Sequence, residues 1–175
     1  MNAIIMAAGT SSRFAPLSYE KPKGLLEVKG EILIERQIRQ LHEAGINDIT
    51  IVVGYKSSQF HYLMEKFGVR LVMNEDYNVY NNTSSIIRVL DLLEDTYICS
   101  SDNYFPSNVF MEKPAESYYS ALYAEGKTSE YCMTLDDEDN IKITLHSGGV
   151  VQVPPGTRGA IIHLRNSHGS PMGGT

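Results

Sequence analysis

Strand-like and helix-like segments alternate along the first hundred residues, and this alternation limits the possible folds more than any other feature. Short apolar runs typical of buried strands occur at 3–8, 48–53, 69–73 and 96–100. Between these runs, apolar residues recur at helical spacing, and Gly45 and Gly68 are placed to end two of the helices. The pattern predicts an α/β fold with a doubly wound, mostly parallel, Rossmann-like sheet.

Three helices are expected, each indicated by its own set of residues. The first is indicated by the spacing of Ile34, Ile38 and Leu41. The second is expected to have Ser57 as N-cap and to bury one face, formed by Phe60, Leu63, Met64 and Phe67. The third is expected over 84–93, with its apolar register given by Ile86, Ile87, Leu90 and Leu93. Farther on, apolar segments at 131–135 and 141–145 flank an acidic loop and predict an antiparallel hairpin appended to the sheet.

Three polar or small-residue segments follow strands of the predicted parallel sheet. They are the loop at 7–13, the Val-Gly-Tyr sequence at 53–55 and the Ser-Asp-Asn-Tyr sequence at 101–104. Ligands of such sheets bind at the carboxyl ends of the strands. We therefore expect these segments to converge on one crevice.

The loop after the first strand is built from small residues and ends in Arg13. Such a loop can present backbone N–H groups to phosphate. It lacks the Gly-Lys-Ser/Thr ending of the phosphate-binding loop and the three spaced glycines of the dinucleotide fingerprint. A plain β-to-α turn accounts for the small residues but not for Arg13 or for the basic sequence at 21–23. Arg13 suggests an anionic ligand, whereas either lysine alone is better explained as solvated surface.

Composition narrows the class of protein. The formal net charge of −6 argues against a nucleic-acid partner, and no apolar run is long enough for a membrane span. The N-terminus has no secretory-signal pattern, and Cys99 and Cys132 have no metal-like spacing, so a cytoplasmic protein is expected. All 21 acidic residues precede position 140, and the glycine- and proline-containing segment at 150–175 reads as an atypical tail after a domain at 1–149.

The sequence at 7–28, AAGTSSRFAPLSYEKPKGLLEV, resembles the signature of the nucleoside-triphosphate-dependent nucleotidyltransferases. The glycine that usually stands two places after Gly9 is Ser11 here. The sequences at 80–86 and 101–104 are similar to the branch that makes CDP-choline from CTP and phosphocholine. The similarity extends from Met1 to about Ile143.

The resemblance implies a nucleotidyltransferase-type fold and a set of site residues. The loop residues expected to bind the triphosphate are Ala7, Ala8, Gly9, Thr10 and Ser11. Arg13 and Lys23 would neutralise its charge, and Asp102 would hold Mg²⁺. The family's second acidic ligand comes later in the domain, whereas this sequence has no acid after Asp139, so we expect a domain incomplete at its C-terminal end.

Each assignment has a structural alternative. Asp102 could cap a helix instead of binding a metal. Asn82, Thr83 and Ser84 could contact the base, cap a helix, or do both. Asn103 and Tyr104 are expected beside the acceptor, together with Tyr119 or Tyr131 from a tyrosine-rich stretch. Aromatic faces suit a quaternary ammonium, but strand tyrosines also pack half-exposed sheets.

The leading hypothesis is a Mg²⁺-dependent cytidylyltransferase that acts on CTP and phosphocholine or a related small phosphorylated acceptor. A sugar-1-phosphate nucleotidyltransferase would share the loop but would need more polar groups for its acceptor. A nucleotide-binding fragment without turnover is the third hypothesis. The sequence indicates no oligomeric state.

Overall fold

The computed structural model describes residues 1–12, 15–80, 82–114, 118–123, 126–128, 132–135, 138, 141–145, 151–153 and 158–164. The chain divides into two compact units, Met1–Ser117 with Leu164–Thr175, and Tyr118–His163. The first unit contains the parallel sheet and all the described residues of the predicted nucleotide loop.

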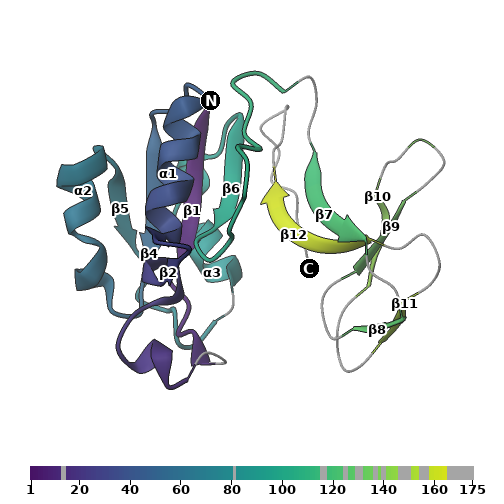
Figure 1. Ribbon diagram of the computed structural model, residues 1–175, viewed down its shortest axis with the longest axis horizontal. Coiled ribbons are helices and arrows are strands. Elements are labelled where there is room, and N and C mark those ends of the chain that lie inside the picture. The colour runs from purple at the N-terminus through teal and green to yellow at the C-terminus, as the bar shows by residue number, and fades with distance from the viewer. Residues whose placement is uncertain are drawn as a thin grey trace. The chain divides into compact units, whose positions relative to one another are not determined.

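The sheet of the first unit has the order β6-β1-β4-β5, and every neighbouring pair in it is parallel. Its strands are β1 (Asn2–Ala7), β4 (Ile49–Val53), β5 (Arg70–Met73) and β6 (Thr96–Ser100). β1 lies between β4 and β6, with Met6 opposite both Val52 and Ser100 (Figure 1). The four predicted strands and the predicted fold class are therefore confirmed.

The central strands are buried on both faces, as their unbroken apolar sequences require. Ile4, Ile5 and Ile51 have no exposed surface. On one face, Ile4 packs with Val52 and Val89. Full burial of side chains of this size supplies roughly 1.5–3 kcal/mol each, so this layer stabilises the unit.

Helix α1 (Leu33–Glu43) confirms the first predicted helix, with Ile34, Ile38 and Leu41 fully buried. It follows a short hairpin of β2 (Glu27–Val28) and β3 (Glu31–Ile32). Both turn residues between these strands have positive φ, 53° at Lys29 and 81° at Gly30, as a tight hairpin requires. Gly45, at φ 81°, follows the C-cap Ala44 and ends the helix as predicted.

The second predicted helix is divided. A 3₁₀ helix, η4 (Ser57–Phe60), precedes α2 (Tyr62–Phe67), and Ser57 is the first residue of η4, not the N-cap of α2. Phe60 and Leu63 are fully buried, but Met64 is 44% exposed, so its predicted burial is wrong. The tighter 3₁₀ turn changes the angular phase of the residues that follow it, which moves Met64 off the buried face. Gly68 ends α2 at φ 71°, as predicted.

The third predicted helix is also shorter than expected. Helix α3 (Asn82–Ile87) stops before η5 (Leu90–Leu92), so one helical register does not continue to Leu93. Ile87 and Leu90 are 59% and 49% exposed, whereas Val89 is fully buried against the sheet. The break lets Val89 take the core position that the sequence pattern assigned to Leu90.

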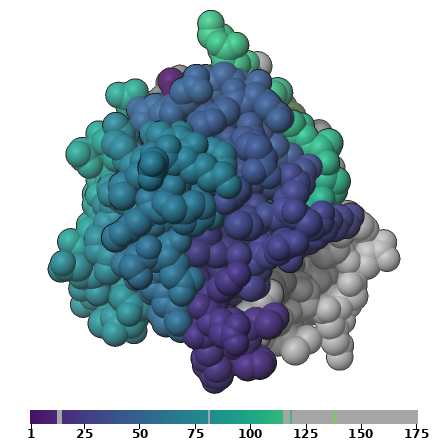
Figure 2. All heavy atoms as spheres, turned by 60° about the vertical axis from the view of Figure 1, so that its left-hand side comes forward, coloured from purple at the N-terminus to yellow at the C-terminus, as the bar shows by residue number. Residues whose placement is uncertain are grey.

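Helices α1 and α2 lie side by side and are joined by a buried carboxylate (Figure 1). Glu35 of α1 accepts hydrogen bonds from the Tyr62 hydroxyl at 2.9 Å and from Lys66 Nζ at 2.7 Å. Burial raises the pKa of Glu35, but the hydrogen bonds from Lys66 and Tyr62, together with the positive charges of Lys66 and Arg39, outweigh it and leave that pKa below its ordinary value. Figure 2 shows the teal and blue atoms of this region, with the N-terminal residues in purple as a lobe at its lower end.

The described residues of the second unit lie mainly in strands. These strands are β7 (Tyr119–Tyr123), β8 (Gly126–Thr128), β9 (Cys132–Leu135), β10 (Ile141–Leu145), β11 (Val151–Val153) and β12 (Arg158–Leu164). β9 and β10 form the predicted antiparallel hairpin, with Leu145 opposite Cys132.

The described part of the predicted tail contains strands. β11 pairs with β8, and β12 pairs with β9 through Arg158 and Gly159. The composition of 150–175 does not reveal these strands, because a tail low in charged side chains and rich in glycine has little alternating polarity. Among the described residues, no helix has the length and apolar character needed to cross a membrane.

Candidate functional site

A cleft of about 350 Å³ lies where β1 and β6 end. Two of the three segments predicted to converge at this edge line it, and the beginning of α3 contributes as well. The described lining residues are Met6, Ala7, Gly9, Thr10, Ser11, Ser12, Pro22, Lys23, Gly24, Asn82, Ser100, Ser101 and Asp102. Of the predicted nucleotide-loop residues, only Ala8 is not among them, and it is buried.

The loop after β1 gives the cleft a wall with few side chains. Gly9 and Thr10 are exposed, and a Cβ added at Gly9 would meet no atom within 4 Å. Ser11 has a left-handed backbone, at φ 58°, and its hydroxyl accepts the Lys23 backbone N–H at 3.4 Å. The loop is thus tied to the segment that carries Lys23. Arg13 lies outside the described residues, so its predicted place at the end of this loop stays a prediction.

Lys23 and Asp102 meet across the cleft although 79 residues separate them. Lys23 Nζ lies 3.3 Å from Asp102 Oδ2, and the Ser100 hydroxyl donates to Asp102 Oδ1 at 2.6 Å. No helix begins among the described residues 103–114, so the alternative that Asp102 caps a helix is wrong. Its carboxylate instead contacts the Lys23 ammonium and the Ser100 hydroxyl, and all three residues line the cleft.

Gly24 explains how Lys23 comes so close to the end of β6. Gly24 belongs to η3 (Lys23–Leu25), and a Cβ at this position would lie 2.8 Å from the Ser101 Cβ. No side chain fits in that space. The glycine after Lys23 was visible in the sequence as part of the resemblance, but its role depends on a contact between segments far apart in the chain.

The segment after β4 supports the site instead of lining it. Gly54 and Tyr55 are not among the described lining residues, so the expectation that 53–55 would form part of the crevice is wrong. The Tyr55 N–H donates to the Ala8 carbonyl at 3.1 Å, which supports the nucleotide loop from behind. A Cβ at Gly54 would come within 2.8 Å of that same carbonyl, so only glycine permits this approach.

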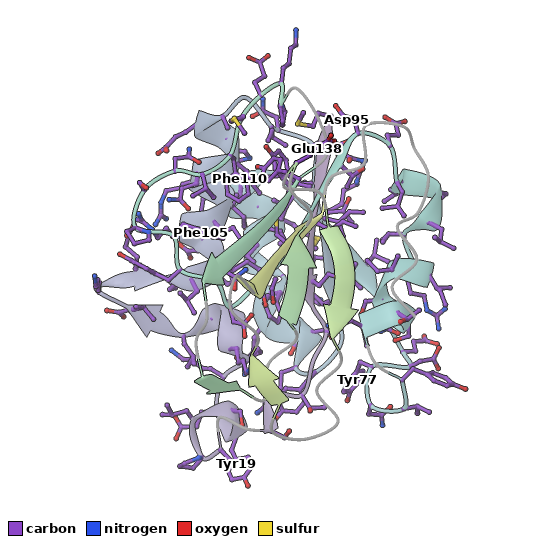
Figure 3. All side chains as sticks on the ribbon, turned by 90° about the vertical axis from the view of Figure 1, so that its right-hand side faces the viewer. Tyr19, Tyr77, Asp95, Phe105, Phe110 and Glu138 are labelled. Carbon is purple, nitrogen blue, oxygen red and sulfur yellow. The ribbon has the colours of Figure 1, made fainter. Side chains whose placement is uncertain are left out.

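Side chains of the same segment also hold the lobe that contains η2 (Leu17–Tyr19). Three consecutive backbone carbonyls, at positions 18–20, accept hydrogen bonds from Tyr55 Oη, Lys56 Nζ and Gln59 Nε2 at 3.1, 2.8 and 3.0 Å. Tyr19 itself is 68% exposed and projects outward at the end of the lobe (Figure 3). These three hydrogen bonds fix the backbone immediately before Lys21, Pro22 and Lys23.

The three residues expected to contact the base lie in different surroundings. Asn82 begins α3 and lines the cleft. Thr83 is exposed and is not among the described lining residues. Ser84 is buried, and its hydroxyl accepts a hydrogen bond from Asn74 Nδ2 at 2.8 Å. Since α3 begins at Asn82, Ser84 lies in its first turn and has a structural partner.

The predicted acceptor residues are only partly described. Tyr104 has the Arg36 guanidinium 5.0 Å and the Lys29 ammonium 5.4 Å from the centre of its ring, so cations of the protein already lie against it. Asn103 has a buried Nδ2 without a hydrogen-bond partner. Tyr119 begins β7, where the structure describes the backbone, and Tyr131 lies outside the described residues.

The fold and the cleft are those of a nucleotidyltransferase. The chain belongs to the family of the MobA-like NTP transferase domain, which matches residues 3–133. Nucleotidyltransferases of this family generally use a divalent metal ion.

Two of the individual relatives that the chain matches are cytidylyltransferases. The chain is 43% identical over 142 residues to choline-phosphate cytidylyltransferase of Streptococcus pneumoniae, a match that covers 81% of this chain and 62% of that protein. It is 41% identical over 152 residues to 2-aminoethylphosphonate cytidylyltransferase of Lancefieldella rimae, covering 85% of this chain and 61% of the relative. The chain therefore spans about three fifths of the length of these relatives.

A solved structure of CTP:phosphocholine cytidylyltransferase from Streptococcus pneumoniae superimposes on the chain with a TM-score of 0.85. The two sequences are 38% identical, and the match covers 94% of this chain and 70% of the other. The resemblance stated from the motifs is thereby confirmed.

Proposed function

We propose that the protein transfers a cytidylyl group from CTP to phosphocholine, giving CDP-choline and pyrophosphate. The observation that carries the proposal is the meeting of Lys23 and Asp102 beside the small-residue loop, in a chain 43% identical to a choline-phosphate cytidylyltransferase. A cytoplasmic location, predicted from the sequence, belongs to the same proposal.

In this reaction a phosphate oxygen of phosphocholine attacks the α-phosphorus of CTP. The new P–O bond forms as the bond to the bridging oxygen of the β-phosphate breaks, and pyrophosphate leaves with that electron pair. The nucleophile is already an anion, so no side chain has to be activated. Catalysis then consists mainly of positioning and of neutralising negative charge.

The chain's residues supply those two functions in the proposal. The loop residues Gly9, Thr10 and Ser11 offer backbone N–H groups to the β- and γ-phosphates. Arg13 can form paired hydrogen bonds with phosphate oxygens. Lys23 is a flexible point charge that can turn from Asp102 toward the α-phosphate.

Mg²⁺ fits the donors that the structure provides. The described residues hold no group of three His, Cys, Asp or Glu side chains, so a metal cage made by protein alone is not formed there. One carboxylate, Asp102, faces the cleft, and Mg²⁺ is commonly bound by one or two carboxylates together with substrate phosphates. When bound, Mg²⁺ would offset the charge of the phosphates.

The remaining predicted contacts complete the proposal. Asn82 lines the cleft, which supports its predicted contact with the base, and Thr83 and Ser84 stay predicted nucleotide-binding residues. Asn103, Tyr104, Tyr119 and Tyr131 stay the predicted acceptor residues. The division into a domain at 1–149 and a tail at 150–175 likewise stays a prediction.

A second acceptor is favoured by a specific observation. The relative from Lancefieldella rimae is named for 2-aminoethylphosphonate, and its identity to this chain, 41%, is close to that of the choline-phosphate enzyme. This acceptor has a primary ammonium that donates hydrogen bonds, whereas a quaternary ammonium needs aromatic faces. Its reaction would join the same cytidylyl group to a phosphonate oxygen.

The test is pyrophosphate release with CTP, Mg²⁺ and a panel of phosphocholine, phosphoethanolamine, 2-aminoethylphosphonate and glucose 1-phosphate. The proposal expects release to be fastest with phosphocholine, and preference for any other acceptor overturns that assignment. Calorimetric titration with CTP tests the nucleotide site separately. Arg13→Ala should weaken CTP binding at least about tenfold, because a charged hydrogen bond contributes on the order of 1.5–3 kcal/mol.

A further inference from the structure

Ser100, the last residue of β6, connects the sheet, helix α1 and the cleft. Its backbone lies opposite Met6 of β1 in the parallel register. Its carbonyl accepts a hydrogen bond from Gln37 Nε2 of α1 at 3.1 Å, and Gln37 is 99% buried. Its hydroxyl donates to Asp102 Oδ1. Ser100 is therefore fixed on two sides before it reaches toward Asp102.

The hydrogen bond from Ser100 limits how the Asp102 carboxylate can turn. At 2.6 Å it has the length usual for a charge-assisted hydroxyl–carboxylate hydrogen bond. The contact to Lys23 is longer, at 3.3 Å, and comes from a flexible side chain. Of these two contacts, the one from Ser100 is better able to set the orientation of the carboxylate.

The hydrogen bond from Ser100 affects which oxygen of the Asp102 carboxylate is available to a ligand. Ser100 engages Oδ1, whereas Oδ2 faces Lys23, a residue that also lines the cleft. A ligand that draws the ammonium of Lys23 away would leave Oδ2 facing the cleft while Oδ1 stays hydrogen-bonded. Asp102 follows the end of β6 by two residues and is not in a helix or strand, so its backbone alone does not impose this orientation.

We propose that Ser100 is a positioning residue that holds the Asp102 carboxylate with Oδ2 toward the cleft for a divalent cation. The inference rests on the proposed function, because it takes Asp102 to be the residue that holds the metal. In this proposal Ser100 does not contact the cation itself. It acts through the hydroxyl–carboxylate bond, as partners that orient metal-binding carboxylates do in other proteins.

The test measures Mn²⁺ binding by electron paramagnetic resonance, with saturating CTP and no acceptor. Four proteins are compared with wild type: Ser100→Ala, Ser100→Thr, Asp102→Asn and, as a matched control, Ser107→Ala at an exposed serine on the segment that follows. We expect Ser100→Ala to bind Mn²⁺ about tenfold more weakly. Ser100→Thr retains a hydroxyl and should restore most of the affinity, and Ser107→Ala should match wild type.

A double-mutant cycle separates positioning from a general effect on folding. In the Asp102→Asn background, Ser100→Ala should cause little further loss, because its effect passes through the carboxylate. A full additional tenfold loss in that background overturns the proposal, as does wild-type affinity in Ser100→Ala. Thermal unfolding of each variant identifies any change that comes from loss of the folded state.

The outcomes also distinguish this inference from the proposed function. If Asp102→Asn weakens Mn²⁺ binding and Ser100→Ala does not, only the role of Ser100 is rejected. If Ser100→Ala weakens Mn²⁺ binding but the panel assay prefers a different acceptor, the positioning role stands and the phosphocholine assignment is rejected. Mn²⁺ binding that is insensitive to Asp102→Asn rejects Asp102 as the metal-binding residue and with it the role of Ser100, whereas the phosphocholine assignment is decided by the panel assay alone.

Discussion

At the scale of single residues, the contact between Lys23 and Asp102 gives the cleft two opposite charges that each suit a different part of a nucleotide–metal complex. Their side chains are 25% and 33% exposed, so each can reach a ligand without rearrangement of the core. An exposed pair of this kind contributes little to stability. Its importance lies in what each group can bind once the two separate.

Replacement of Lys23 should therefore have opposite effects on two ligands. Lys23→Met removes a charged contact to phosphate and should weaken CTP binding at least about tenfold, for a loss on the order of 1.5–3 kcal/mol. The same change removes the cation beside Asp102 Oδ2, so Mn²⁺ should bind the nucleotide-free variant more tightly than the wild type. Calorimetry measures the first effect and paramagnetic resonance the second.

Lys21→Met is the matched control, since Lys21 is an exposed lysine two residues away that is not among the described lining residues. It should leave both affinities close to those of wild type. Equal losses of CTP affinity in the two variants would show that the effect is one of overall charge and would contradict the specific role of Lys23.

At the scale of elements, close backbone contacts hold the loops to the sheet. Gly24 brings η3 against the end of β6, and Gly54 brings the end of β4 against the loop after β1. In both places a Cβ would lie less than 3 Å from another atom. Close backbone approaches at these two glycines therefore help to assemble the site.

Gly24→Ala should consequently damage the site. The added methyl group has to displace η3 from Ser101, at a cost of roughly 1–3 kcal/mol in the free energy of unfolding, and should move Lys23 away from Asp102. Denaturant unfolding and CTP titration measure the two effects. Gly9→Ala is the control, because a Cβ at Gly9 has open space. It should leave stability almost unchanged, and an equal loss of stability in both variants would contradict the packing argument.

The contact between α1 and α2 should make stability depend on pH through Glu35. The pKa of Glu35 is lowered in the folded protein, so its contribution is fully present above the unfolded value of about 4.5 and is lost as the pH falls through the folded value. The free energy of unfolding of the wild type should therefore fall more steeply below pH 4.5 than that of Glu35→Gln. At pH 7 the variant should be less stable, because Lys66 and Tyr62 lose a buried ionised partner.

Denaturant unfolding at a series of pH values from 3 to 7 tests this prediction. Glu65→Gln on α2 is the control, since Glu65 is exposed. Wild type and Glu65→Gln should show the same dependence on pH. Parallel curves for wild type and Glu35→Gln would exclude Glu35 as the source.

At the scale of the whole molecule, the described lining of the cleft lies entirely within one of the two compact units. A chain shortened to 1–149 should therefore bind CTP with an affinity within about threefold of the full chain, measured by calorimetry. The same truncation removes β11 and β12 and leaves edges of β8 and β9 unpaired, so the shortened chain should aggregate more readily. Loss of CTP binding in a monomeric, folded sample would show that the tail is needed for the nucleotide site.

Local sequence patterns correctly predicted the strands of the parallel sheet, the hairpin of β9 and β10, and the glycines that end α1 and α2. They did not predict that the second and third helices are interrupted near Phe60 and Val89. An apolar residue at helical spacing and one beside a break in the helix look alike in sequence. Which of them is buried depends on the fit to the sheet, as the burial of Val89 in place of Leu90 shows.

The sequence by itself determined the fold class and the residue types of the site, because strand and helix periodicities and the loop motif are local properties. Only the tertiary structure decided that Gly54 and Tyr55 support the loop from behind, that Ser84 faces inward to Asn74, and that Ser100 orients Asp102. These roles come from contacts between segments distant in the chain, or from side-chain directions at the ends of strands. Neither is encoded in the spacing of residues, since both depend on which atoms the folded sheet brings within a few ångströms of each other.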